Sequence, residues 1–130
     1  DFFLLAPDFD GPTRYRAYAE FTTKFGQQPR PQHEILRFIE AFEDALKDNP
    51  KYADALARGE LQPIEATLIE NAMSTWETFM LGQGYRLSDL KLTRLDARYN
   101  WREVFQTVIR RDLKRQAASR VDDAAVPVTL

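Results

Sequence analysis

The chain has 130 residues, a length typical of one domain, and its 44% hydrophobic and 29% charged residues are usual for a globular protein. It contains no cysteine, which excludes disulfides, thiolate metal sites and a cysteine nucleophile. The net charge of −2 lacks the basic excess that nucleic-acid-binding domains usually show. No segment has the run of about 18 apolar residues that spans a bilayer.

The first twelve residues are predicted to form an extended arm followed by a loop, because Phe2 to Leu5 are apolar and residues 7–12 are rich in Pro, Asp and Gly. A first helix is predicted from Arg14 to Phe25, with Thr13 as its N-cap. At helical spacing, one face of this segment would carry Tyr15, Tyr18, Phe21 and Phe25.

The clearest periodicity predicts a second helix from His33 to Asp48, where apolar residues recur every three to four positions over about four turns. Its apolar stripe consists of Ile35, Phe38, Ile39, Phe42, Ala45 and Leu46. Asn49-Pro50 is typical of a helix start, and a short helix is expected from Pro50 to Arg58, ending at Gly59.

A long helix is predicted from Pro63 to Leu81, with Trp76 and Met80 on its broad apolar face. The segment 85–100 is open to two interpretations, a short helix capped by Ser88 or an irregular packed segment. A last helix is expected from Asp96 or Trp101 to Arg120, followed by a loose tail over 121–130. Together these elements predict one all-α domain over 1–130, a compact bundle of about five helices cut from a longer protein.

The last predicted helix would present a basic outer face formed by Arg110, Arg111, Lys114 and Arg115. Such a face can meet an acidic protein, follow phosphates, or simply complement the helix dipole. Asp112 would fall within the apolar stripe, where it needs a charged partner, a contact to another chain, or a position beyond the core edge. Tyr15 and Tyr18 on the first helix would add a half-exposed aromatic patch.

An acidic cluster, Glu40, Glu43 and Asp44, places carboxylates on neighbouring turns of the second helix. This pattern is similar to that of the all-α nucleotide pyrophosphatases, which implies Mg²⁺ and a nucleotide, but the second acidic pair of that family is missing here. A solvated acidic face is the ordinary interpretation. The single histidine, His33, has no partner pattern for catalysis or metal binding.

These patterns predict a non-enzymatic helical protein-interaction or regulatory module, with a protein partner that the sequence does not identify. The two alternatives are a nucleic-acid-binding domain using the basic face, and a Mg²⁺-dependent nucleotide enzyme. No catalytic residue, cofactor or metal ligand is assigned. The predicted binding surface consists of Arg110, Arg111, Asp112, Lys114, Arg115, Tyr15 and Tyr18. A soluble, cytoplasmic location without membrane insertion is expected, and the oligomeric state is left open.

Overall fold

The computed structural model describes residues 2–21 and 30–113. They form a mixed α/β fold with one four-stranded sheet, so the predicted all-α bundle is wrong. The strands are β1 (Phe2–Asp8), β2 (Arg14–Glu20), β3 (Gln62–Ile69) and β4 (Ile109–Leu113). The helices are α1 (Gln32–Leu46), α2 (Pro50–Ala57), α3 (Ala72–Gly82) and α4 (Trp101–Val104), with a short 3-10 helix, η1 (Leu87–Asp89).

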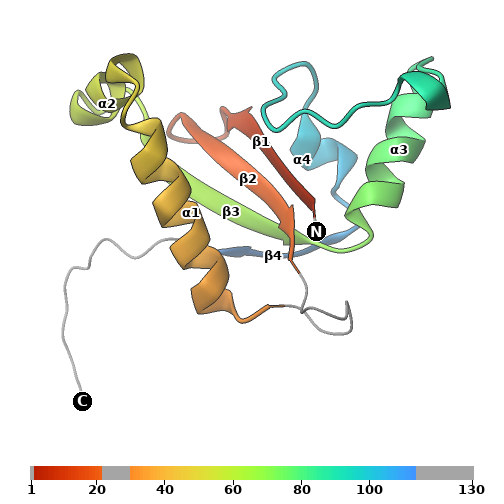
Figure 1. Ribbon diagram of the computed structural model, residues 1–130, viewed down its shortest axis with the longest axis horizontal. Helices are drawn as coiled ribbons and strands as arrows, with labels where there is room; N and C mark the ends of the chain where they lie inside the picture. Colours follow the sequence, from red (N-terminus) through yellow and green to blue (C-terminus); the bar gives the residue numbers. More distant parts are fainter. Residues whose placement is uncertain (1, 22–29, 114–130) are drawn as a thin grey trace.

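The sheet has the strand order β1-β2-β3-β4 (Figure 1). An antiparallel hairpin joins β1 to β2, and Gly11 in its turn has a φ of +79°, which a side chain would strain. The central pair, β2 and β3, is parallel, because α1 and α2 carry the chain back to the same end of the sheet. β4 returns antiparallel to β3 and is an edge strand.

The segment predicted as the first helix is strand β2. Its residues from Arg16 to Ala19 are all buried, because helices cover both faces of the sheet. A strand buried on both faces loses the two-residue alternation that identifies strands in a sequence. Tyr15, Tyr18 and Phe21 are spaced three residues apart, as on a helix face, and this spacing led to the wrong prediction.

The predicted helix from Pro63 to Leu81 is in fact a strand followed by a helix, β3 and α3. The two elements meet at Asn71, whose φ of 53° lies in the left-handed region. Pro63 stands near the start of β3, where a missing N–H is tolerated. Only the second half of the predicted apolar face, including Trp76 and Met80, is helical.

The predicted last helix is also wrong within the described residues. α4 makes a single turn, and the chain then enters β4, where Arg110, Arg111 and Asp112 are exposed. Ile109 and Leu113 stand four residues apart, which is the spacing of one helix face. In β4 they lie on opposite faces of the sheet, and the register of β4 against β3 shifts between Leu68 and Ile69. Residues 114–120 and the predicted tail over 121–130 lie outside the described residues.

The two central helices are confirmed: α1 and α2 lie within two residues of their predicted bounds. Asn49 caps α2 as expected, since its side-chain oxygen accepts a hydrogen bond from Lys51 N at 2.9 Å. The predicted N-terminal arm is extended and forms strand β1. The segment 85–100 is mostly irregular, and its one helical turn, η1, contains Ser88 rather than being capped by it.

The sheet separates two apolar clusters, with α1 on one side and α3 with α4 on the other (Figure 1). The α1 side contains Phe3, Leu5, Ala17, Ala19, Ile35, Ile39, Ile64, Ala66 and Leu113. The α3 side contains Phe2, Leu4, Ala6, Tyr18, Ile69, Ala72, Trp76, Met80, Trp101 and Phe105. None of the helices in the described ranges is long and apolar enough to cross a bilayer.

Candidate functional site

The segment between α3 and α4, residues 83–100, is the longest irregular stretch between two described elements and is called the α3–α4 loop below. Its only regular element is the turn η1. Long irregular loops inside a compact domain are often functional, because a rigid scaffold can hold binding groups on them.

Backbone hydrogen bonds fix the α3–α4 loop to the edge of the sheet. Leu5 N donates to Arg94 O at 2.7 Å, and Asp96 N donates to Leu5 O at 2.9 Å. The two bonds form an isolated parallel bridge between Leu5 and Leu95. The middle of the loop is therefore held at one point of β1, although it does not continue the sheet.

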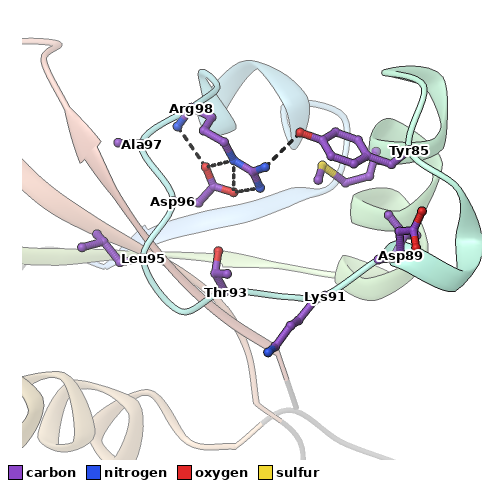
Figure 2. Close-up of a pocket in the computed structure, with 10 residues that line it drawn as sticks. Tyr85, Asp89, Lys91, Thr93, Leu95, Asp96, Ala97 and Arg98 are labelled. Atoms are coloured by element: carbon purple, nitrogen blue, oxygen red, sulfur yellow. Dashed lines mark hydrogen bonds and ion pairs between the residues drawn. The ribbon is translucent and has the colours of Figure 1, made fainter.

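A buried carboxylate adds a second attachment beside this bridge. Asp96 Oδ1 accepts hydrogen bonds from the backbone N and the Nε of Arg98, at 2.9 and 3.1 Å. Its Oδ2 accepts from Arg98 Nη2 at 2.6 Å, which makes the pair bidentate. Arg98 Nη1 in turn donates to the Tyr85 hydroxyl at 2.9 Å, as Figure 2 shows.

The pKa values of this cluster favour a permanently charged pair. Burial raises the pKa of Asp96, but the hydrogen bonds from Arg98 outweigh burial and hold that pKa below its usual range. The hydrogen bond to Asp96 raises the pKa of Arg98 in turn. The indole N–H of Trp101 lacks a hydrogen bond of standard geometry, yet it adds a smaller contribution that lowers the pKa of Asp96.

Two open hollows of about 420 Å³ each share Ala97 and Arg98 in their linings. The first lies along the loop itself and is lined by residues from Met80 to Arg98, including Tyr85, Lys91 and Thr93 (Figure 2). The second lies between the β1–β2 turn and α4, and its lining includes Asp8, Tyr18 and Arg102. Their volumes lie in the range of small-molecule sites.

The cations of the α3–α4 loop fall into two groups. Arg86 and Arg98 are paired with Asp89 and Asp96. The exposed side chains of Lys91 and Arg94 make no ion pair or hydrogen bond with other described residues. In Figure 2, Lys91 extends away from the Asp96–Arg98 pair. The loop therefore offers two uncompensated positive charges on a backbone that is fixed to the sheet.

A second polar cluster crosses the sheet face on the α3 side and is called the sheet-face network. Arg16, only 8% exposed, bonds Asp8 through Nε at 2.7 Å and Glu65 through Nη2 at 3.1 Å. Thr67 Oγ1 donates to Asp112 at 2.5 Å. The hydrogen bond from Arg102 lowers the pKa of Asp112 to about 2, since it outweighs partial burial. Arg14 Nη1 also lies 3.1 Å from Glu65 Oε2, so three arginines face three carboxylates in the network.

The predicted partner-binding residues are dispersed. Arg110 and Arg111 are exposed on β4, and Arg111 Nη1 donates to Gln32 at 2.9 Å. Asp112 finds its charged partner in Arg102, at 2.8 Å. Lys114 and Arg115 lie outside the described residues.

The two tyrosines of the predicted surface are not an exposed patch. Tyr15 is half-buried, with its ring 6.3 Å from that of Tyr52. Tyr18 is only 2% exposed, and burial raises its pKa to about 12. The burial of both side chains is a consequence of the strand conformation of β2, where the sequence had predicted a helix.

The acidic cluster on α1 is divided between core and solvent. Glu43 is buried, and its Oε2 accepts from the Tyr52 hydroxyl at 2.8 Å and from Ile64 N at 2.9 Å. Glu40 and Asp44 are exposed, and Asp44 pairs with Lys47 at 3.5 Å. No group of three potential metal ligands comes together in the described part of the chain.

Sequence reasoning missed Asp96, Arg98 and Lys91 as a functional group. The signal was the Asp-x-Arg spacing at 96–98 within a long stretch that lacks helical periodicity. Nothing in the sequence places Leu5 beside Arg94, because that contact joins opposite ends of the described chain.

Residues 1–99 match the family model described as the GH3 family C-terminal domain, whereas a search of curated proteins gave no match. The match and the mixed α/β fold overturn the prediction of a helical interaction module, and the basic helix face on which the nucleic-acid alternative depended does not exist in the described residues. Since the matched residues cover well over half of the chain, it belongs to the GH3 family as a C-terminal domain.

Proposed function

We propose that this domain completes a substrate site together with the other part of a longer GH3-family protein, and that its α3–α4 loop supplies Lys91 and Arg94 to hold an anionic group. The description of the family as a C-terminal domain supports a preceding region with which the domain shares a site. Sites for small molecules often lie between domains. The observation that carries the proposal is the pair of uncompensated cations on a fixed loop.

The fixed backbone matters because a mobile cation binds an anion weakly. Each long side chain that is ordered on binding loses conformational entropy, and an ordered backbone reduces the remaining cost. Lysine and arginine are the usual ligands of phosphate and carboxylate groups. The nearby hollow of about 420 Å³ leaves room for the rest of a small anionic molecule.

Among the described residues, two of the acids that line the hollows, Asp89 and Asp96, are unsuited to form a catalytic pair. Cleavage of a glycosidic bond requires two carboxyl groups about 5 to 10 Å apart, one of them with a raised pKa. In the described residues, the acids that line the two hollows include Asp89 and Asp96, which are paired with arginines, and the pKa of Asp96 is lowered. A lowered pKa is opposite to the need of a general acid. The residues described here therefore support a contribution to binding rather than glycoside cleavage.

The proposal is tested by titrating the chain with inorganic phosphate and, separately, with acetate, while two-dimensional proton–nitrogen NMR follows each backbone amide. We expect saturable shifts centred on residues 85–98, with a Kd on the order of millimolar because only part of the site is present. A stronger response to phosphate or to acetate identifies the anion class.

The variants Lys91→Gln and Arg94→Gln are expected to weaken this binding about tenfold each, because each variant removes one charged contact to the anion. Arg110→Gln and Lys51→Gln remove exposed cations elsewhere and serve as controls. Shifts spread evenly over all basic residues, or the absence of saturation with both anions, would refute the proposed function.

A further inference from the structure

Asp96 differs from the other acid of the α3–α4 loop, Asp89, by its burial. Only 2% of its side chain is exposed, compared with 55% for Asp89 on the same loop. A buried carboxylate is costly unless its oxygens are bonded, and Arg98 satisfies both of them. The buried carboxylate is therefore fully bonded, although the Arg98 side chain is 47% exposed.

The side chain and the backbone of Asp96 act at the same point of the fold. Its N–H bonds Leu5 O on β1, while its carboxylate holds Arg98. Arg94 is fixed next to it, because Arg94 O accepts the hydrogen bond from Leu5 N. Loss of the carboxylate would release Arg98 and loosen the backbone at the Leu5–Leu95 bridge, which holds the main chain of Arg94.

Arg98 extends the attachment toward α3. Its guanidinium carbon lies 5.7 Å from the centre of the Tyr85 ring and 5.5 Å from that of Tyr99. The two tyrosine hydroxyls are 3.3 Å apart. One buried acid thus connects both ends of the loop on which Lys91 and Arg94 stand.

Buried ion pairs add little net stability compared with apolar residues of similar volume. Such a pair can instead hold its two side chains in one relative orientation, since the bidentate contact fixes the distance and the angle between the carboxylate and the guanidinium group. We infer that Asp96, acting through Arg98, is a positioning residue that holds Lys91 and Arg94 in the orientation in which they bind an anion. This inference rests on the proposed function, whose anion site it explains.

The test compares Asp96→Asn with a control away from the hollow, Asp54→Asn, which removes a carboxylate from the exposed Arg58–Asp54 pair on α2. Asp96→Asn is expected to weaken phosphate or acetate binding about tenfold and to accelerate hydrogen exchange at the amides of Leu5 and Asp96 at least tenfold. Circular dichroism melting of each variant shows that the sheet and helices remain folded. Asp54→Asn should leave both the affinity and the exchange rates unchanged.

Arg98 provides a second pair of variants with smaller structural risk. Arg98→Lys keeps the charge but not the bidentate contact, and it should retain more affinity than Arg98→Gln. The double variant of Asp96→Asn and Arg98→Gln should bind no more weakly than Asp96→Asn alone, because the two residues act as one unit.

The outcomes separate the two proposals. If the unchanged chain binds neither anion, the proposed function fails and this inference fails with it. If the unchanged chain binds an anion, and Asp96→Asn binds it equally well with unaltered exchange at Leu5, only the positioning role of Asp96 is refuted.

Discussion

Glu43 is the most deeply buried carboxylate among the described residues, with 1% of its surface exposed. It joins α1 to α2 through the Tyr52 hydroxyl and to the start of β3 through Ile64 N. A carboxyl group is retained in this position because both donors would otherwise be buried without an acceptor. The residue that the sequence offered as a metal ligand is thus a structural connector.

Replacing this connector should destabilise the protein strongly. Glu43→Ala removes the acceptor of two buried donors, and we expect the free energy of unfolding to fall by about 3 kcal/mol in urea titrations. Glu40→Ala, on the exposed side of the same helix, should change it by no more than about 0.5 kcal/mol. Equal effects of the two variants would contradict the structural role of Glu43.

Asp112 makes a prediction for pH. Its pKa is about 2 in the folded protein compared with 3.8 for a free side chain, chiefly because of the hydrogen bond from Arg102. A lowered pKa stabilises the fold above pH 4 and loses this contribution as the pH falls toward 2. Because the side chain is 36% exposed, solvent screening reduces the contribution to about 1 kcal/mol.

The measurement is the free energy of unfolding between pH 5 and pH 2, for the unchanged chain and for Asp112→Asn. Both should become less stable in acid, since Asp96 also has a lowered pKa. The unchanged chain should lose about 1 kcal/mol more than the variant. Parallel curves for the two proteins would show that the Arg102–Asp112 pair contributes nothing.

At the scale of elements, α3 depends on a residue of the neighbouring strand. The carboxylate of Glu20, at the end of β2, accepts from Asn71 N at 3.2 Å and from Ala72 N at 3.0 Å. The first N–H groups of a helix have no partner within it, and a negative charge there is favourable. The Asn71 side chain does not cap the helix, so Glu20 takes this role.

Glu20→Gln should therefore loosen the start of α3. We expect a loss of about 1 kcal/mol in the free energy of unfolding, and faster hydrogen exchange at Asn71 and Ala72 than in the rest of α3. Glu70→Gln changes a neighbouring exposed acid and is the control. Unchanged exchange at both amides in the Glu20 variant would rule out the capping role.

The two helices that the sequence predicted with nearly correct bounds, α1 and α2, have one-sided packing. α1 and α2 have one apolar face, and the Asn49-Pro50 start is a local signal that needs no tertiary context. β2 and β3 are buried on both faces, so their apolar residues follow no period of two, and tertiary packing decided their conformation. Both strands were predicted as helices for this reason.

The candidate site was even harder to predict from the sequence than the strands. Lys91 and Arg94 are ordinary surface cations until the structure shows that Leu5 holds their loop. Asp96 is an unremarkable acid until its burial is known. Only the Asp-x-Arg spacing was visible, and such a pair does not by itself indicate that the carboxylate is buried.

At the scale of the whole molecule, the sheet lies between two separate apolar clusters and contributes residues to both. Residues of one strand contribute alternately to both, as Leu4 and Leu5 do on β1. Neither α1 nor α3 with α4 can therefore bury its apolar face unless the sheet is present. The two sides should unfold together, since each requires the same four strands.

The parallel pairing of β2 with β3 also sets an order of assembly. The β1–β2 hairpin closes over a short turn, but β3 reaches β2 only after a stretch on the order of 40 residues, which makes this contact entropically expensive and slow to form. During synthesis the ribosome must release α1, α2 and β3 before the centre of the sheet can exist. Until then the nascent hairpin exposes the strand edge of β2, and it is in this interval that the chain is most exposed to association with other unfinished chains.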